Sequence, residues 1–169
     1  MARPDLSHVP GYYHKYIAQV NAEDVTEALE QHVNYFERYL KTIPPIKWEY
    51  AYSPGKWTIK EVIQHIIDSE RVFAYRALRI ARMDPTPLPG FNENLFALNA
   101  NANKRKISDL VDEFSLVRSS SLALFRSFED EQLNKIGVAN DQPISVEGIG
   151  FIIAGHALHH VNVINERYL

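Results

Sequence analysis

Two histidines one helical turn apart are the residues of this sequence whose spacing most directly suggests chemistry. His156 and His160 lie within residues 155–160, which read GHALHH, in a run whose pattern is typical of a helix. Both side chains share one face of that helix with apolar residues, so they point toward a buried surface. Placed this way, two imidazoles can bind one metal ion. The alternative is a pair of core histidines that hydrogen-bond to the backbone or to each other, since a buried polar group needs a partner.

A candidate for a third nitrogen ligand lies far upstream. Residues 57–71 read WTIKEVIQHIIDSER, with His65 two turns into a predicted helix. The Trp-Thr-Ile-Lys-Glu-Val opening, this histidine and the C-terminal Gly-His-x-x-His-His pattern together resemble the DinB-like superfamily of small bacterial helical proteins. The resemblance extends from about residue 29 to the C-terminus. It implies the fold of that superfamily and a metal site made of His65, His156 and His160, and it does not identify a substrate.

The implied ligand set has a defined chemistry. Three neutral imidazoles hold a borderline divalent ion, so zinc, nickel, manganese and iron are all candidates. Three protein ligands also leave a coordination position for water or substrate, which distinguishes a catalytic site from a closed structural one. We therefore expect a divalent metal ion and a small-molecule substrate.

The resemblance implies two enzymatic activities. Similar proteins include metal-dependent hydrolases and S-transferases that use bacillithiol or mycothiol, so a low-molecular-weight thiol is a second expected cofactor. We favour the transferase slightly, because the sequence shows no clear general base for hydrolysis beside the three histidines. The nearby titratable residues are Asp68, Glu70 and His159. The alternative to an enzyme is a metal-binding helical bundle with a stress-response or binding role.

Three further polar positions could take part in the site. His159 could replace His160 as a ligand, or it could line the rim. Asp68, one turn after His65, could orient that imidazole, as carboxylates often do around metals, or lie on the helix surface. His32 falls on the buried stripe of the first predicted helix and could be a further ligand, a pocket residue or a core histidine.

Composition narrows the class of protein. The chain of 169 residues carries a net charge of −3, which argues against a nucleic-acid partner. It has no cysteine, so disulfides, thiolate zinc sites and cysteine nucleophiles are excluded. No apolar run reaches the roughly 18 residues that a membrane span needs, and the opening MARPD does not begin a signal peptide. We expect a cytoplasmic protein without membrane contact, made of one domain over residues 1–169.

Hydrophobic periodicity predicts an all-α protein. The four long helices are expected at about residues 23–41, 58–83, 109–128 and 145–168. Thr58 and Glu61 fit a capping box, and Ser108 and Ser145 are the expected N-caps of the last two helices. The long segment at residues 84–106 predicts a four-helix bundle with a crossover connection between helices 2 and 3. Residues 1–21 are expected to form an irregular N-terminal arm.

Two of these helices carry unusual patterns. On a helical wheel His65 lies about 120° from the centre of its apolar face, so a metal role requires that helix to be buried on more than one side. The last helix is apolar nearly all round, so it is either central or faces a partner in a homodimer.

Buried charges and crossover side chains complete the predictions. Glu70 and Arg118 both fall on inward stripes, and we expect them to pair, because lone charges are rarely buried. The competing use of Arg118 is to bind a substrate carboxylate. Phe91, Asn92 or Phe96 of the crossover could cover the site or belong to a surface loop.

Overall fold

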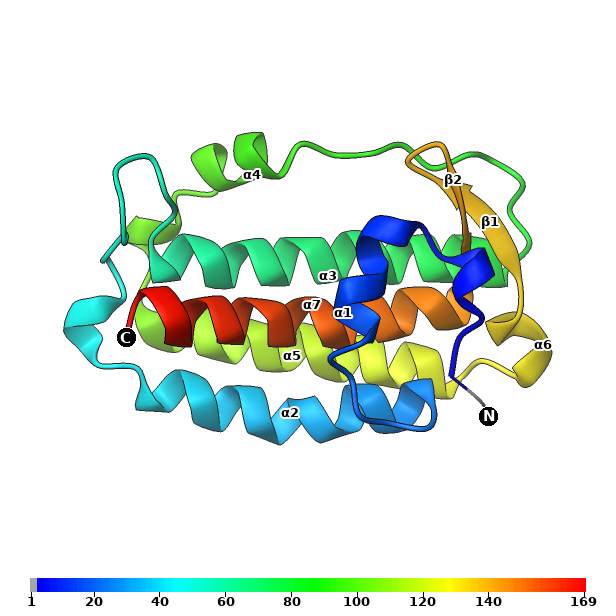
Figure 1. Cartoon of the computed structure of the whole chain (residues 1–169), viewed down its shortest axis with the longest axis horizontal. Helices are drawn as coiled ribbons and strands as arrows, with labels where there is room; N and C mark the ends of the chain where they lie inside the picture. The colour runs from blue at the N-terminus through cyan, green and yellow to red at the C-terminus, as the bar shows by residue number, and fades with distance from the viewer. Residues whose placement is uncertain (1–2) are drawn as a thin grey trace.

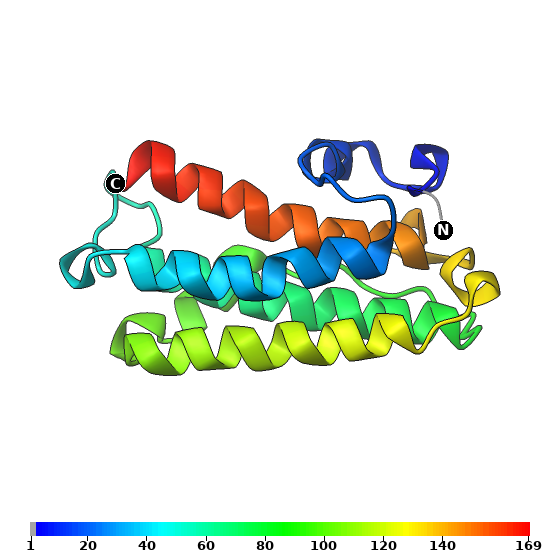
Figure 2. The same ribbon diagram turned by 90° about the horizontal axis from the view of Figure 1, so that it is seen from below.

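Four long helices form the body of the protein. The computed structural model describes residues 3–169, apart from the side chains of His32 and Asn34, so the prediction for His32 lies outside the described residues. The bundle consists of α2 (Val25–Thr42), α3 (Ile59–Ala81), α5 (Ile107–Arg126) and α7 (Val146–Arg167). Both α2 and α3 pack against α5 and α7, so the two helices that follow each other in the chain lie across the bundle (Figures 1 and 2). The predicted four-helix bundle is confirmed.

Local signals in the sequence account for the helix starts. The Thr58 hydroxyl accepts a hydrogen bond from the Glu61 amide at 3.2 Å, and the Glu61 carboxylate accepts one from the Thr58 amide at 2.7 Å, which completes the predicted capping box of α3. Ser145 caps α7 as predicted, by accepting from the Gly148 amide at 3.1 Å. The predicted start of α5 is wrong by two residues. That helix begins at Ile107, and Ser108 lies in its first turn.

The crossover returns along the whole bundle. After α3 the chain runs back through α4 (Glu93–Asn99) and η4 (Ala102–Lys104) before α5 begins, so α3 and α5 point in the same direction (Figure 1). The long crossover between the second and third bundle helices is therefore confirmed. It carries α4 over the outer side of α3, against which it packs.

A small hairpin adds two short strands to the otherwise helical fold. After α6 (Asp130–Leu133), β1 (Ile136–Ala139) pairs antiparallel with β2 (Gln142–Ser145). Asn140 and Asp141 form the turn with φ of 52° and 59°, left-handed values that Asn and Asp tolerate in two-residue hairpin turns. Strands of four residues are too short for a clear alternating pattern, which explains why periodicity missed them. Leu88 bonds to Val138 and Asn140 at 2.9 Å, so the hairpin anchors the start of the crossover.

The N-terminal arm is more regular than expected. It contains η1 (Leu6–His8), η2 (Gly11–Tyr13) and α1 (His14–Ile17), and a further turn, η3 (Pro45–Lys47), follows α2. The arm packs on α7 at Gly155, where a Cβ atom would overlap the Tyr16 carbonyl group. Because α7 contacts α1, α2 and α3, it occupies a central place, as its all-round apolar pattern allowed. Within the described residues, no helix combines the length and apolarity needed to span a membrane.

A polar layer divides the core in two. One apolar cluster gathers around Phe73, Phe125 and Ile152, and the other around Phe36, Ile63 and Phe114. Buried polar side chains from three bundle helices lie between these clusters along the sequence of each helix; they are Ser69, Glu70, Arg118, Ser121 and His156. Polar groups are costly to bury without partners, so this layer is the part of the core most directly suited to function.

Candidate metal centre

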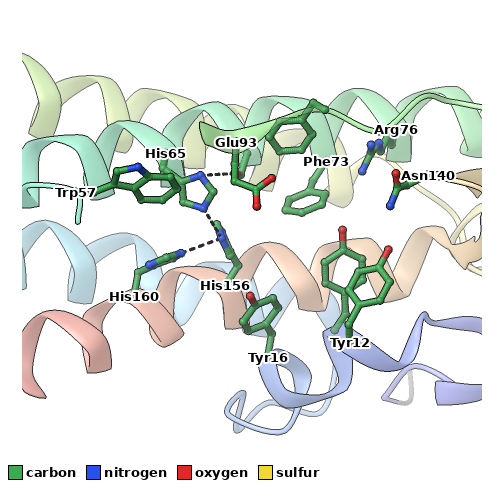
Figure 3. Close-up of a pocket in the computed structure, with 14 residues that line it drawn as sticks. Tyr12, Tyr16, Trp57, His65, Phe73, Arg76, Glu93, Asn140, His156 and His160 are labelled. Carbon is green, nitrogen blue, oxygen red and sulfur yellow. Dashed lines mark hydrogen bonds between the residues drawn. The ribbon is translucent and has the colours of Figure 1, made fainter. Parts of the chain in front are cut away.

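The three histidines singled out from the sequence meet between α3 and α7. The Nε2 atom of His156 lies 3.0 Å from Nε2 of His65 and 3.1 Å from Nε2 of His160. One nitrogen from each ring falls within a group whose members all lie within 4.8 Å of one another. Figure 3 shows the three rings converging from two helices, with His65 opposite the pair on α7. The structure thus brings together residues that are 91 and 4 positions apart.

His65 reaches this place because α3 is buried on more than one side. Residues on several faces of the helix are buried, including Lys60, Gln64 and Ile67 outside the main apolar stripe. A helical wheel places His65 at the flank of that stripe, and the flank here faces α7. The condition that the sequence set for a role of His65 is therefore met.

Burial keeps the three rings neutral. It lowers the pKa of His65 to about 4, with the Glu93 carboxylate acting in the opposite direction. Burial also holds the pKa of His156 and of His160 well below the ordinary value, and neighbouring imidazoles add to the effect in both cases. A neutral imidazole has a lone pair that a metal can share, whereas a protonated one has none.

The arrangement of nitrogens suits a divalent ion. With metal–nitrogen bonds of about 2.0 to 2.1 Å and tetrahedral angles, two ligand nitrogens are separated by about 3.3 Å. The two separations to His156 Nε2, 3.0 and 3.1 Å, are close to that value. The Nε2 atom of His156 carries either one proton or one lone pair, so it cannot form a good hydrogen bond to both of the other Nε2 atoms at once. The donor set and its spacing therefore fit a borderline cation such as zinc.

Residues around the histidines orient them. The Ser69 hydroxyl lies 3.4 Å from Nδ1 of His65, where it can accept that proton and leave Nε2 free. The indole of Trp57 packs against the His65 ring with a centroid distance of 4.8 Å. Asp68 does not orient His65; it accepts a hydrogen bond from Gln64 at 2.9 Å. Of the two sequence alternatives for Asp68, the one in which it orients the imidazole does not hold; its neighbour Ser69 occupies that place because it lies one full turn after His65.

His159 lies outside the cluster. Its ring packs against Tyr16, with centroids 5.1 Å apart, and it borders a second cavity on the other side of His160. Partial burial lowers its pKa. Because the α-helix turns by about 100° per residue, His159 and His160 cannot point to the same place. Of the two sequence alternatives, the structure brings His160 to the cluster.

A cavity of about 390 Å³ opens beside the three histidines. It is bounded by α3 and α7, by the N-terminal arm and by the crossover, as the labelled side chains in Figure 3 show. Aromatic rings form much of its wall; they belong to Tyr12, Tyr13, Tyr16, Trp57, Phe73 and Phe91. The volume and the mixture of aromatic walls with a few polar groups are typical of a small-molecule site.

Glu93 brings a carboxylate to this cavity, which the sequence gave no reason to expect. It is the first residue of α4, and Asn92 caps that helix by accepting hydrogen bonds from the amides of residues 94 and 95. Figure 3 shows the carboxylate pointing into the cavity beside His65 and Phe73. Its charge opposes the lowering of the His65 pKa and raises the pKa of Tyr16. No periodic pattern marks Glu93, because only the folded crossover places it here.

The three crossover residues named from the sequence lie in different surroundings. Phe91 lines the cavity and packs against Phe96, with ring centroids 5.1 Å apart. Phe96 is itself largely exposed and is not part of the cavity wall. Asn92 is used as a helix cap. The prediction that the crossover covers the site is thus correct for Phe91 alone among the three.

Glu70 and Arg118 form the predicted buried pair. The carboxylate of Glu70 accepts three hydrogen bonds from Arg118 at 2.9 to 3.1 Å, and Arg118 is fully buried. Arg118 does not border the cavity, so the alternative that it binds a substrate carboxylate is wrong. The pair lies in the polar layer that also holds His156.

Comparisons with known proteins agree with the fold. A sequence model of the DinB superfamily matches residues 28–164. A putative metal-dependent hydrolase of Oceanobacillus iheyensis, OB0413, is 26% identical over 148 residues, which cover 85% of this chain and 84% of that protein. The solved structure of YfiT from Bacillus subtilis, described as a probable metal-dependent hydrolase with an unusual four-helix bundle topology, matches with a TM-score of 0.72 at 18% identity. That match covers 97% of this chain and 90% of YfiT. The chain therefore belongs to the DinB superfamily.

Proposed function

We propose that this protein is a metal-dependent hydrolase that acts on a small molecule, with His65, His156 and His160 as the metal ligands. The observation that carries the proposal is the convergence of three neutral imidazoles at one end of a cavity of about 390 Å³. A divalent ion bound there would supply Lewis acidity, which polarises a carbonyl group and makes water more acidic. The description of OB0413 as a metal-dependent hydrolase supports the same class of reaction.

Glu93 supplies the general base that the sequence alone did not offer. Its carboxylate points into the cavity beside His65, so it can accept a proton from the water that attacks the carbonyl carbon and return that proton to the leaving group. The lack of such a base was the reason for favouring a transferase, and Glu93 removes that reason.

Tyr16 is placed to help on the opposite side of the cavity. Burial raises the pKa of its phenol, and Glu93 acts in the same direction, so the phenol stays protonated at neutral pH. Its ring lies 5.5 Å from the His156 ring, measured between centroids. A protonated phenol there can donate a hydrogen bond to the oxygen that becomes negative during attack on a carbonyl group.

A thiol S-transferase is the second candidate, and one observation favours it. A second cavity of about 280 Å³ borders His160 from the other side and shares Trp57 with the first. Two cavities that meet at the same histidine could seat two substrates, such as a low-molecular-weight thiol and an electrophile. In that reaction the thiol sulfur forms a bond to the electrophilic carbon, the leaving group departs with the bonding electrons, and the thiol proton goes to solvent.

Activity assays on metal-loaded protein test these alternatives. The protein is loaded separately with zinc, nickel, manganese or iron and incubated with a panel of small esters and amides, and with a thiol plus a model electrophile. Hydrolysis without thiol consumption supports the hydrolase, and thiol conjugation alone supports the transferase. A metal-dependent rise in melting temperature with every assay blank supports the alternative of a non-enzymatic metal-binding bundle.

Two variants assign the roles within the hydrolase. His156→Ala should abolish turnover together with metal binding. Glu93→Gln should lower kcat by about 10²- to 10⁴-fold, the usual contribution of a general base, and should leave the metal-dependent rise in melting temperature unchanged. Glu166→Gln is the matched control, because Glu166 is an exposed carboxylate on α7 that does not border the cavity. Equal loss of kcat in both glutamine variants would rule out Glu93 as the base. Cytoplasmic location, dimerisation and the lack of a nucleic-acid partner stay predictions from the sequence.

A further inference from the structure

Arg76 occupies the end of the cavity opposite the histidines. It follows His65 in α3 by 11 positions, about three turns or about 16 Å along the axis, so the two side chains leave the same face of the helix. Figure 3 shows Arg76 and Asn140 at one end of the cavity and the imidazoles at the other. Among the described residues that line the cavity, Arg76 is the only lysine or arginine.

The guanidinium of Arg76 is held in place by neutral groups. It is 3% exposed, its Nη2 donates to the Pro89 carbonyl at 2.6 Å, and its centre lies 5.9 Å from the ring centroids of both Phe73 and Phe91. These contacts hold the group next to two aromatic rings. They do not neutralise its charge.

No carboxylate in the described part of the chain lies within 4.0 Å of the Arg76 guanidinium. Arg118, the other deeply buried arginine, shows the usual arrangement, since Glu70 neutralises it. Buried charges are almost always paired, because an uncompensated charge is expensive to remove from water. A buried arginine that borders a cavity and has no carboxylate partner is therefore suited to receive one from a ligand.

Hydrogen-bond donors beside Arg76 complete an anion site. Burial, with the neighbouring Tyr12, raises the pKa of the Tyr13 phenol, although Arg76 acts in the opposite direction, so the phenol stays protonated and can donate. Asn140 lines the same end of the cavity from the hairpin turn, and its side-chain amide offers two further N–H groups. The hairpin and the N-terminal arm, which the sequence did not connect with the site, thus both contribute to it.

We propose that Arg76 binds a carboxylate of the substrate and thereby points the rest of that molecule toward the three histidines. The inference rests on the proposed hydrolase function and adds the substrate class, a small carboxylic acid whose scissile bond lies away from the carboxylate. A single guanidinium with neutral donors matches one negative charge. A phosphate ester carries close to two negative charges near neutral pH. It would match the cavity less well, because Arg76 is the one arginine or lysine among the described lining residues and the Glu93 carboxylate adds a negative charge.

Binding measurements with matched ligands test this proposal without turnover. Isothermal titration calorimetry compares benzoylglycine with its uncharged amide, benzoylglycinamide, on the full chain with and without zinc. We expect the acid to bind at least about tenfold more tightly than the amide, because a charge-assisted bidentate contact to arginine is stronger than a neutral one. The preference should persist without metal and in His156→Ala, so it can be observed even if the hydrolase proposal fails.

Variants separate recognition of the charge from a structural role. Arg76→Gln should bind acid and amide equally, whereas Arg82→Gln, which removes an exposed arginine from the C-cap of the same helix, should keep the preference. Arg76→Lys retains the positive charge without the forked guanidinium, so it should keep part of the preference for the acid. If Arg76 only anchors the crossover through Pro89, both ligands will weaken alike in Arg76→Gln, which overturns the proposal.

Three further outcomes also overturn it. They are equal affinity of acid and amide for the unaltered protein, no binding of either at millimolar concentration, and tighter binding of phenyl phosphate than of benzoylglycine. Circular dichroism verifies that each variant is folded. If Arg76→Gln does not fold, the acid-to-amide ratio in the unaltered protein and in Arg76→Lys decides the question.

Discussion

Zinc should stabilise this protein through the three histidines, and His156→Ala should remove that effect. The Nε2 atom of His156 is the one that both other Nε2 atoms approach, at 3.0 and 3.1 Å. Its loss leaves two imidazoles without the nitrogen that lies between them. An ion that binds the folded chain and not the unfolded chain raises the free energy of unfolding by mass action.

The size of the effect follows from the zinc concentration relative to Kd and from the chain length. The ligands are already neutral and already close together, so binding does not have to displace a proton from a charged imidazole. At a free zinc concentration about a thousand times Kd, the stabilisation is about 4 kcal/mol. For a chain of this length each kcal/mol shifts the melting temperature by about 2 to 4 °C, so zinc should raise it by about 8 to 16 °C.

The assay is thermal unfolding with and without zinc for each protein, so that any direct cost of a substitution cancels. His65→Ala and His160→Ala should also lose most of the zinc-dependent shift. His159→Ala should retain it, since His159 lies outside the cluster, and His8→Ala, an exposed histidine of the arm, is a second control. The reasoning is refuted if His156→Ala keeps the full shift, or if none of zinc, nickel, manganese and iron stabilises the unaltered chain.

Three further predictions concern the framework of the site. Gly155→Ala should lower the free energy of unfolding by about 1 to 3 kcal/mol, because the added Cβ overlaps the Tyr16 carbonyl. Chemical denaturation measures this loss, and Gly11→Ala, whose Cβ meets nothing within 4 Å, is the control that should change little. Equal losses in the two variants would contradict the packing argument. Glu70→Gln should lower the free energy of unfolding by about 3 to 5 kcal/mol, because it leaves the fully buried Arg118 without its counter-charge. The double variant Glu70→Leu with Arg118→Met should recover most of that loss. A loss below about 1 kcal/mol in Glu70→Gln would be inconsistent with a buried pair. In the metal-free protein the three histidines have folded-state pKa values below their ordinary 6.5. Their contribution to stability is therefore complete above about pH 6.5 and is lost as pH falls toward 4. Urea unfolding between about pH 7 and 5 tests this, and stability that rises on acidification would show that the sign is wrong.

Local patterns were sufficient for the helices and for two of the three proposed metal ligands. A helix needs an apolar stripe and a suitable first turn, and both are written in short segments such as the capping box at Thr58 and Glu61. The same periodicity places His156 and His160 on one face of α7. His65, the third member of the cluster, was found through a family resemblance. Periodicity alone would not have selected it, because the helical wheel of α3 puts His65 at the flank of the apolar face.

The remaining residues of the cavity depend on where segments without strong periodicity come to lie. Arg76 had a signal, since a spacing of 11 residues places it on the His65 face of α3. Glu93 and Asn140 had none. Glu93 is placed by the packing of α4 against α3, and Asn140 by backbone hydrogen bonds between the hairpin and Leu88. The arm brings Tyr16 to His156 through a close approach at Gly155 that no local pattern describes.

The sequence by itself therefore determined the helical class, the helix limits to within a few residues, and the two histidines that share one turn of α7. Only the tertiary structure decided that Glu93 rather than Asp68 stands beside His65, and that Arg76 is the one lysine or arginine among the described residues that line the cavity. The physical reason is one of range. Periodicity and capping act over a few residues, whereas burial, pairing and cavity shape depend on which distant segments pack together.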